Sequence, residues 1–571
     1  MARVVAAVAS GLLLAAAFPR VNLSAVAWVA LMPLLVAMRG RALRQSAALG
    51  WTTGFVFFLA TLSWVPDTIS NFTTIEPALA LGLWVLMSAA AANAHTFFAI
   101  GVEWLATGGH SRLLTVPLVW AVVEWSRTFF LMGFPWNPLG TSQMRVPLFA
   151  QFADIGGVYG VSAVIALASA ALAEAWARWR SGADRAASAP ASAGLVPLLV
   201  LAAACPAAML FYGAARLAWL DSVPYSGSLR VAVAQGNIAQ DQKWDATLQD
   251  RIFARYLDLT TQAADAGARL VVWPEAALPF YLRLDMRSIE LVKIARERGI
   301  DLLVGAPGYE DRGDGQGLRD RNQAWLIRST GDLAGPYDKI QLVPFGEYIP
   351  LYGLFGMVDI AVESVGQMGR GTERVIFESA PLSPALEAGD SGPGVDATDG
   401  NESGADSAAV AKAGKEPGAD SGAVPTAGED PVVGRPARFG VLICYEGIFP
   451  GLTREFAAAG ADFLVNISND AWYGDTAAPD QHLVMAAMRA IENRMPLVRS
   501  TNTGISAFVT DEGELSSMTG LFREEMAMET VLVRDVWSFY RTFGDVFVYG
   551  CLLILTVLGA ASWRSRKPAI S

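Results

Sequence analysis

Three short phrases of the sequence bring together a thiol, a carboxylate and an ammonium group. Cys444 follows the apolar run Phe-Gly-Val-Leu-Ile, Glu275 follows Leu-Val-Val-Trp-Pro, and Lys339 opens Lys-Ile-Gln-Leu-Val-Pro. A free thiol is only slightly ionised at neutral pH, so it needs a base or a positive neighbour to act as a nucleophile. A carboxylate can take the thiol proton, and an ammonium group favours the thiolate and stabilises an oxyanion. These residue types predict covalent catalysis through Cys444.

Other groups that could pair with this thiol or activate it are scarce. Cys205 and Cys551 fall inside strongly apolar runs, so Cys444 has no expected disulfide partner. His482 is the one histidine outside the expected membrane spans and their loops, and its amphipathic helix favours a structural role. With so few cysteines and histidines, we expect no metal site and no cofactor.

The surrounding sequence predicts elements that hold the three groups at strand ends. Between Leu229 and Val533, short β-rich runs alternate with amphipathic helices. The expected strands are Leu229 to Ala234, Leu270 to Trp273, Leu302 to Gly305, Ala324 to Arg328, Phe439 to Cys444, Phe463 to Ile467, Leu497 to Ser500 and Ala507 to Thr510. The expected helices are Asp245 to Ala264, Met286 to Arg298, Leu452 to Ala459 and Gln481 to Asn493. This alternation predicts a layered α/β domain with its chemistry in the loops after the strands.

The composition indicates a membrane protein, because 17% of the residues are charged, against roughly 25% in a typical soluble domain. We expect a polytopic α-helical protein with eight spans, each near the roughly 20 residues that cross a hydrocarbon core. They are Val4 to Phe18, Leu23 to Met38, Ala47 to Val65, Ala78 to Ile100, Leu114 to Phe130, Val158 to Ala177, Leu195 to Ala214 and Phe547 to Trp563. The first is also compatible with a signal peptide, since Arg3 precedes a short apolar core with small residues.

The basic residues of the loops predict the orientation of these spans. They follow every second span, and they are Arg39, Arg41, Arg44, Arg112, Arg178, Arg180, Arg185, Arg564, Arg566 and Lys567. The loop from Pro66 to Pro77 contains neither lysine nor arginine. Because basic loops stay in the cytoplasm, both termini are expected there and the α/β domain outside, in the periplasm or its equivalent. Within the fifth span, Glu124 and Arg127 lie three apart and can pair on one helix face.

These observations divide the chain into three parts. We expect a transmembrane domain of seven helices at 1–218, a catalytic domain at 219–541, and a last transmembrane helix with a cytoplasmic tail at 542–571. Residues 381–436 are rich in Gly, Ala, Ser, Asp and Pro, which predicts a disordered insert without catalytic residues. The net charge of −11 argues against a nucleic-acid partner, which would require a basic face.

Several longer motifs carry a resemblance to a known family. They are Gln-Gly-Asn-Ile with Trp244 following, Trp-Pro-Glu-Ala-Ala-Leu-Pro, Lys-Ile-Gln-Leu-Val-Pro-Phe-Gly-Glu-Tyr-Ile-Pro, Ile-Cys-Tyr-Glu, Asn-Ile-Ser-Asn-Asp-Ala-Trp-Tyr-Gly and Arg-Ser-Thr-Asn-Thr-Gly-Ile-Ser-Ala. Together with Glu-Trp-Ser-Arg and Gly-Phe-Pro-Trp-Asn in the membrane part, they resemble the apolipoprotein N-acyltransferases of the nitrilase, or carbon-nitrogen hydrolase, superfamily. The insert between Glu347 and Cys444 departs from the compact pattern of that family.

The resemblance implies a fold, a site and a reaction. The fold is a nitrilase-like αββα sandwich outside the membrane. The site is a triad of Glu275 as general base, Lys339 as oxyanion stabiliser and Cys444 as nucleophile. The supporting residues carried over by motif are Glu347, Tyr445, Glu446 and Trp244.

The implied reaction takes place at the outer face of a bacterial inner membrane. An acyl chain leaves the sn-1 position of a phospholipid, typically phosphatidylethanolamine, and forms a thioester on Cys444. The chain then passes to the α-amino group of the diacylglyceryl-cysteine that begins an apolipoprotein. The implied partners are a phospholipid donor and a diacylated apolipoprotein acceptor.

Two other functions remain open at this point. A membrane-tethered amidase or nitrilase would resolve the thioester with water, although a tether needs only one span. A polytopic transporter or sensor would only bind an amide, although the spans contain no obvious repeat and few charges at mid-membrane. A lid over the site is a further hypothesis for Leu351 to Met357, an apolar stretch that could dip into the bilayer.

Overall fold

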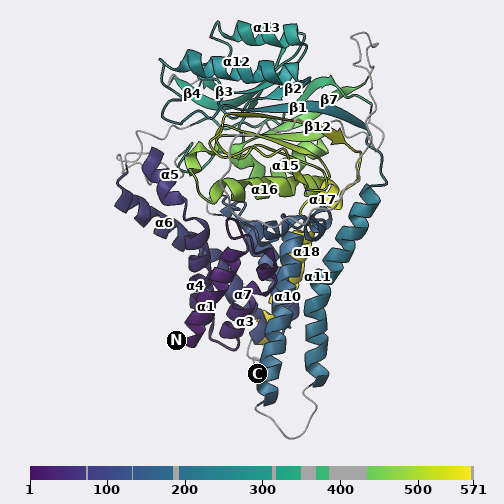
Figure 1. The fold of residues 1–571 in the computed structure, drawn as a ribbon. Helices are drawn as coiled ribbons and strands as arrows, with labels where there is room; N and C mark the ends of the chain where they lie inside the picture. Colours follow the sequence, from purple (N-terminus) through teal and green to yellow (C-terminus); the bar gives the residue numbers. More distant parts are fainter. Residues whose placement is uncertain are drawn as a thin grey trace, which may run out of the picture.

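Apolar helices fill the lower part of the molecule in Figure 1. The structure is a computed structural model, and it describes residues 1–72, 75–130, 133–183, 192–311, 317–348, 368–384 and 434–566. These helices are α1 (Ala2–Ala16), α2 (Ala27–Ala30), α3 (Met32–Met38), α4 (Leu43–Thr61), α5 (Val65–Phe72), α6 (Pro77–Ala91), α7 (Asn93–Thr107), α8 (Arg112–Ser126), α9 (Pro147–Ala150), α10 (Ala153–Ala183), α11 (Ser192–Leu220) and α18 (Val546–Arg566). Helix α1 begins and α18 ends at the lower end, far from the sheets.

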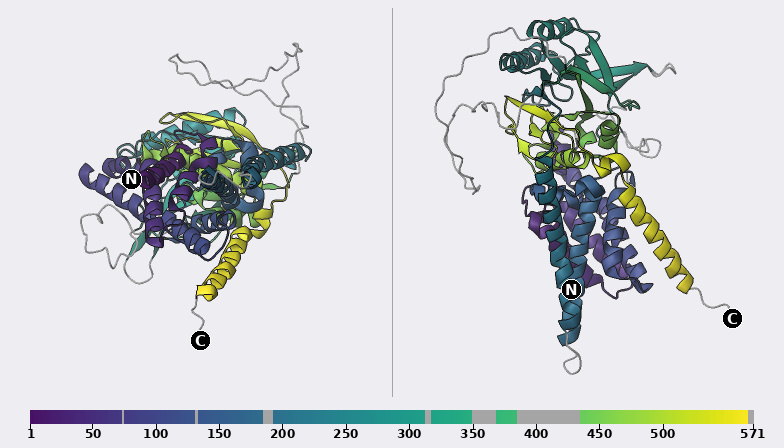
Figure 2. Two further views of the ribbon diagram at one scale, coloured as in Figure 1. Left: turned by 90° about the horizontal axis from the view of Figure 1, so that it is seen from below. Right: turned by 90° about the vertical axis from the view of Figure 1, so that its right-hand side faces the viewer.

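Four segments of the described residues are long and apolar enough to cross a membrane: Pro77–Thr107, Ala153–Ser181, Gly194–Leu220 and Val546–Arg564. Two shorter apolar helical stretches are Ala2–Ala16 and Ser24–Met38. The membrane character is therefore confirmed, and the count of eight spans stays a prediction. In the right view of Figure 2, α18 descends at an angle to α10 and α11.

Two six-stranded sheets form the upper part. The first has the order β12 (Glu525–Val533), β1 (Gly227–Gln235), β2 (Leu270–Val272), β3 (Asp301–Asp311), β4 (Leu318–Ile327) and β5 (Leu333–Asp338). The second has the order β11 (Leu515–Ser516), β10 (Ala507–Val509), β9 (Leu497–Thr501), β8 (Phe463–Ser468), β7 (Pro436–Ile443) and β6 (Ile376–Pro381). In each sheet three central strands are parallel and the outer strands antiparallel.

Helices cover the outer face of each sheet, which gives four layers. Helices α12 (Gln249–Asp265) and α13 (Ser288–Arg298) pack on the first sheet, and α15 (Pro450–Ala458) and α16 (Ala478–Asn493) on the second. In Figure 1, α12 and α13 are outermost, whereas α15 and α16 lie between the sheets and the apolar helices. The expected α/β sandwich is confirmed, and its second sheet is the one nearer the membrane part.

The alternation of side chains along the strands explains the layers. In β1, Val231 and Val233 join the core between the two sheets, whereas Ala232 and Ala234 pack toward α12 on the other face. Successive strand residues point to opposite faces, so one strand serves two cores. Small side chains on the outer face let the helix approach closely.

Buried polar contacts join the sandwich to the apolar helices. Arg494, at the end of α16, has the left-handed φ of 50° and is fully buried. Its guanidinium donates to the Asp154 carboxylate of α10 at 2.8 Å. One turn along α10, the N–H of Val158 donates to the Glu492 carboxylate at 2.8 Å. A buried charge without a partner is costly, so these contacts fix α16 against α10.

Two expected features fall wholly or partly outside the described residues. The expected insert 381–436 is too wide at both ends, because Pro381 closes β6 and Pro436 opens β7. Residues 385–433 of it are not among those that the structure describes, and neither is the lid stretch Leu351 to Met357.

Candidate active site

The carboxyl ends of three strands deliver the three groups that the sequence singles out. Glu275 follows β2, Lys339 follows β5, and Cys444 follows β7. Cys444 has a φ of 53°, in the left-handed region that a residue with a side chain rarely adopts. Such a conformation at a strand end makes a sharp elbow, which turns the side chain out of the sheet.

Lys339 is held between two carboxylates. Its Nζ donates to Glu275 Oε1 at 3.0 Å and to Glu347 Oε1 at 2.8 Å. The side-chain amide of Asn322, on β4, donates to the same Glu275 oxygen at 2.7 Å. The Lys339 side chain is 1% exposed, so these charges interact in a medium of low dielectric. The geometry fixes the direction of the Glu275 carboxylate.

The charges of this cluster set its protonation. Burial raises the pKa of Glu275, but the Lys339 and Lys243 ammonium groups and two hydrogen bonds outweigh it and leave that pKa below its usual value. Burial lowers the pKa of Lys339, yet Glu275 and Glu347 hold it well above the ordinary value. At neutral pH, Glu275 is therefore a carboxylate that can accept a proton and Lys339 a fixed cation.

The Cys444 thiol is buried and neutral in the resting structure. Burial raises its pKa to about 12, and the negative charge of Glu275 adds to this, while Lys339 acts in the opposite direction. The residue is 6% exposed. Because the free thiolate is disfavoured, the sulfur can become nucleophilic only when its proton moves to a base during the attack.

Glu446 ties the lysine segment to the cysteine elbow. Its Oε1 accepts from the backbone N–H of Ile340 at 2.6 Å and of Gln341 at 3.0 Å. Its Oε2 accepts from the N–H of Ile443 at 2.6 Å, and the Tyr337 hydroxyl donates to both oxygens at 2.9 Å. Burial raises the pKa of this carboxyl to about 7. Glu347 thus binds the lysine ammonium, whereas Glu446 positions the backbone on either side of the site.

A second polar network lies beneath the elbow. Its members are Asn466, Asp470, His482 and Arg499, all 0–1% exposed. His482 Nε2 lies 3.2 Å from the Cys444 carbonyl oxygen, to which the Asn466 amide donates at 3.3 Å. The Arg499 guanidinium donates to the Asp470 carboxylate at 2.8 Å and lies 3.1 Å from His482 Nδ1. The structural role expected for His482 agrees with this position.

Burial and the Arg499 charge lower the pKa of His482, and Asp470 only partly opposes them. His482 Nδ1 lies 3.2 Å from the Asp470 carboxylate as well as close to the Arg499 guanidinium, so the imidazole, the carboxylate and the guanidinium form one buried cluster. Asp470, Asn466 and Arg499 were not singled out from the sequence. The motif Asn-Ile-Ser-Asn-Asp, which starts inside β8 and ends just after it, contains both Asn466 and Asp470.

The remaining predicted residues lie around this centre. The Tyr445 hydroxyl donates to the Gly133 carbonyl oxygen of the helical part at 2.7 Å. The side chain of Trp244 is 51% exposed on the loop before α12. Its neighbour Lys243 is 3% exposed, and its Nζ donates to the Glu275 backbone oxygen at 3.0 Å. Lys243 was missed because a lysine in a polar turn is usually exposed.

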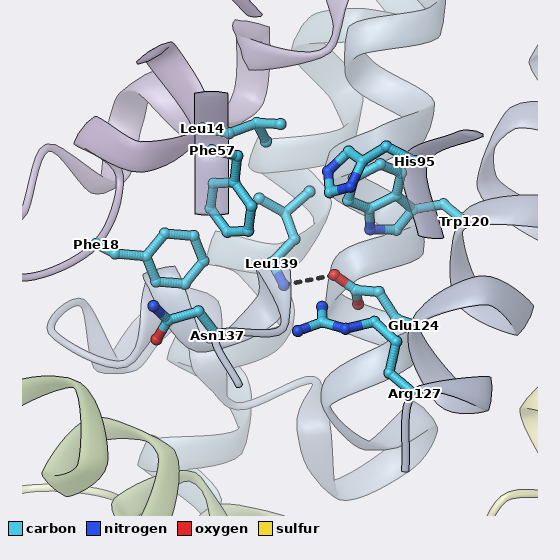
Figure 3. A pocket seen from close by; sticks show the side chains of 9 residues that line it. All are labelled: Leu14, Phe18, Phe57, His95, Trp120, Glu124, Arg127, Asn137 and Leu139. Atoms are coloured by element: carbon cyan, nitrogen blue, oxygen red, sulfur yellow. Dashed lines mark hydrogen bonds between the residues drawn. The ribbon is translucent and has the colours of Figure 1, made fainter. Parts of the chain in front are cut away.

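Glu124 and Arg127 bind the backbone of the segment that begins at Gly133, the residue that accepts from Tyr445. Figure 3 shows the two side chains. They line a cavity with Leu14, Phe18, Phe57, His95, Trp120, Asn137 and Leu139. Glu124 Oε1 accepts from the N–H of Leu139 at 2.7 Å, and Arg127 donates to the Trp136 carbonyl oxygen. Among the described residues no ion pair joins Glu124 to Arg127, so the expected pairing is wrong. Each side chain instead anchors the segment Gly133 to Gln143.

This arrangement combines the parts of covalent acyl transfer. A carboxylate is positioned as a proton acceptor, a cation is fixed beside it, and a thiol stands at a strained elbow.

Comparisons with known proteins extend over nearly the whole chain. A family model described as the apolipoprotein N-acyltransferase N-terminal domain matches residues 10–171, and a model described as carbon-nitrogen hydrolase matches residues 230–538. A protein named apolipoprotein N-acyltransferase from Geobacter metallireducens is 35% identical, with 98% of this chain and 95% of that protein covered. One of the same name from Brucella suis biovar 1 is 31% identical, with 91% and 86% covered.

Among solved structures, a nitrilase-superfamily member from Saccharomyces cerevisiae covers 54% of this chain and 91% of its own, at a TM-score of 0.34 and 16% identity. An amidase from Nesterenkonia sp. AN1, in complex with butyramide, covers 57% and 98%, at a TM-score of 0.35 and 17% identity. From the family models and the full-length relatives, we conclude that this chain belongs to the apolipoprotein N-acyltransferase family, with a domain of the carbon-nitrogen hydrolase type.

Proposed function

We propose that this protein transfers an acyl chain from a phospholipid to the α-amino group of the diacylglyceryl-cysteine that begins an apolipoprotein. The observation that carries this proposal is the position of the Lys339 ammonium between Glu275 and Glu347, with Cys444 at the end of β7 in the other sheet. Membership of the family supports the choice of substrates. The apolar helices that support the sandwich give it access to lipid.

The first half-reaction forms a thioester by a ping-pong mechanism. The Cys444 proton passes to Glu275 while the sulfur attacks the sn-1 ester carbon of the phospholipid, typically phosphatidylethanolamine. Lys339 and the backbone N–H of Tyr445 stabilise the oxyanion. When the intermediate collapses, the ester C–O bond breaks and the leaving alkoxide takes the proton from Glu275, which releases a lysophospholipid. Loss of one oxyanion donor typically slows such a step on the order of 10²- to 10³-fold.

The second half-reaction consumes the thioester. The neutral α-amino group of the acceptor attacks the thioester carbon, and its excess proton passes to Glu275. The C–S bond then breaks, and the departing sulfur recovers the proton from Glu275. The products are an amide on the acceptor and the free Cys444 thiol, so Glu275 ends in its starting state. No cofactor takes part in either step.

The proposed topology gives the site a place at the membrane surface. We propose that domain 219–541 faces the periplasm, that domain 1–218 and the helix in 542–571 span the inner membrane, and that both termini are cytoplasmic. In support, α1 begins and α18 ends at the same end of the molecule, opposite the sheets. By the positive-inside rule, the basic residues Arg39 and Arg112 belong on the cytoplasmic side.

The test supplies the full-length protein, in lipid nanodiscs, with a phospholipid labelled in its sn-1 chain and a synthetic diacylated lipopeptide. We expect mass spectrometry to find the labelled chain as an amide on the lipopeptide's α-nitrogen. The Cys444→Ser variant should give no product while remaining folded and inserted. Acylation that persists in this variant would exclude the covalent route. Release of labelled free fatty acid without acylated lipopeptide would favour a hydrolase instead.

A further inference from the structure

A second lysine belongs to the active-site cluster. Lys243 lies on the loop between β1 and α12 and is 3% exposed. Its Nζ donates to the backbone oxygen of Glu275 at 3.0 Å, whereas Lys339 donates to the carboxylate of the same residue. Lys293 on α13, in contrast, has a side chain that is 67% exposed. A lysine is almost never buried without a charged partner, so this position of Lys243 requires an explanation.

One carbonyl oxygen does not compensate a buried ammonium group. Within the described residues, the Lys243 Nζ makes only that one hydrogen bond, although an ammonium group has three donors. The titratable groups that face it from neighbouring elements are Glu275, after β2, and Cys444, after β7. On its own loop, Asp241 and Asp245 are exposed. The charge of Lys243 is therefore directed at the reacting groups.

Lys339 cannot supply all of the positive charge that the reaction needs. Its ammonium is already shared by two carboxylates, Glu275 and Glu347. Two negative groups and one positive group leave one excess negative charge before any chemistry. Transfer of the Cys444 proton to Glu275 moves this charge to the sulfur without removing it. The positive charge of Lys243 would bring the net charge of this cluster to zero.

We propose that Lys243 is a positioning residue of the acyl transfer, whose ammonium group holds the Glu275 main chain and offsets the negative charge of the Cys444 thiolate and the following oxyanion. The proposal rests on the proposed function of the site. Lys243 acts on the sulfur through its charge and on the proton acceptor through its backbone. Its role thereby differs from that of Lys339, which binds the acceptor carboxylate itself.

The proposal predicts a loss of activity at alkaline pH. Burial lowers the pKa of Lys243 to about 8, while Glu275 and Cys444 act to raise it. Below that pH the ammonium group is present, and above it the group becomes neutral. Thioester formation should therefore slow as the pH rises through about 8. A charge that shifts the thiol pKa by one unit changes the thiolate population about tenfold, so we expect a loss of rate on the order of tenfold.

The test measures the first half-reaction alone, without an acceptor peptide, so that the acceptor amine does not contribute to the pH profile. Full-length protein in nanodiscs reacts with sn-1-labelled phospholipid at pH values between 6 and 10, and samples of the reaction are quenched at successive times. Peptide mass spectrometry then quantifies the label on Cys444. The variants are Lys243→Met and Lys243→Arg, with Lys293→Met as the control for loss of an exposed lysine. Thermal unfolding of each variant reports on folding.

We expect wild type and Lys293→Met to form the thioester more slowly as the pH rises through about 8. Lys243→Met should be slower than wild type on the order of tenfold at pH 7, and its rate should not decline further at alkaline pH. Lys243→Arg should keep its rate above pH 8, because a guanidinium stays charged. If Lys243→Met does not fold, the pH profile of Lys243→Arg tests the proposal by itself. An unchanged decline in Lys243→Arg, or a wild-type rate in folded Lys243→Met, would overturn the inference. Absence of any thioester in the wild type would instead contradict the proposed function.

Discussion

At the scale of single residues, the three groups that the structure brings together and the two glutamates beside them could be predicted from the sequence, whereas the rest of their polar surroundings could not. Glu275 and Cys444 follow buried strands, and strand ends are where an α/β fold gathers its chemistry. Asn322 and Arg499 lie inside strands, where the sequence pattern reports only an alternation of faces. That Asn322 binds Glu275 depends on which strands are neighbours, and this is a property of the tertiary fold.

Asp470→Asn tests the network beneath the elbow. Asp470 is 1% exposed, and its loss leaves the Arg499 guanidinium as a buried charge without its carboxylate partner. We expect the free energy of unfolding to fall by about 3 to 5 kcal/mol, as is typical when one partner of a buried ion pair is removed. Denaturant unfolding followed by tryptophan fluorescence measures this change. Asp475→Asn is the matched control, because its side chain is 75% exposed.

The contribution of Asp470 to the free energy of unfolding should decrease in acid. Burial acts to raise the pKa of Asp470, but Arg499 and His482 outweigh it and hold that pKa well below its usual value. The stability from this carboxylate is thus complete above the unfolded pKa of about 3.9 and is lost as the pH falls below it. The difference in stability between wild type and Asp470→Asn should shrink in acid. A difference that is constant with pH would contradict the role of the charge.

At the scale of elements, the strands that could be predicted are those with continuous apolar runs. The eight expected strands and four expected helices are present with ends shifted by a few residues. Strands β5, β6, β11 and β12 were missed, and each lies at or next to a sheet edge. These strands are more exposed than the central ones, so their sequences carry fewer continuous apolar runs. Strand β12, for instance, carries Glu525 and Glu529 along its length.

Glu446→Gln tests the connection between the segment after β5 and the elbow after β7. The glutamine amide would turn one NH₂ group toward a backbone N–H that now donates to a carboxylate oxygen, so two donors would face each other. We expect thioester formation to slow by about tenfold or more, since an unsatisfied buried donor costs about 1–3 kcal/mol. Label on Cys444 measured over time gives the rate.

Tyr337→Phe is the control for this substitution. It removes the hydroxyl that donates to Glu446 and keeps the three backbone hydrogen bonds that join the two segments. Its rate should therefore stay closer to that of the wild type. Equal rates for wild type and Glu446→Gln would show that the connection does not position the site.

At the scale of the whole molecule, the sequence predicted an α/β sandwich attached to apolar helices, but not how the two parts fit together. The second sheet lies nearer the helices, with α15 and α16 between them (Figure 1). Contacts such as Arg494 to Asp154 and Tyr445 to Gly133 join residues hundreds of positions apart. No local pattern indicates such a pair. These contacts bring the elbow of Cys444 close to the membrane part, where a lipid donor resides.

Deletion of residues 389–427 tests whether the insert takes part in the chemistry. The strands before and after these residues are hydrogen-bonded to each other. β6 and β7 are antiparallel neighbours, and the N–H of Leu382 donates to the Arg435 carbonyl oxygen at 3.1 Å. The shortened chain can therefore still connect these strands. We expect lipopeptide acylation within about threefold of the wild-type rate, because loop length changes closure entropy only slowly. A folded deletion variant without activity would refute this expectation.

The central claim is that one acyl chain travels from lipid to lipopeptide through Cys444. The most direct measurement loads the enzyme with sn-1-labelled phospholipid, removes free lipid, and adds diacylated lipopeptide. We predict that the label on Cys444 decays at the rate at which labelled amide forms on the lipopeptide, with one chain gained for each chain lost. Label that stays on Cys444 while the lipopeptide is acylated from newly added, unlabelled phospholipid would contradict the account.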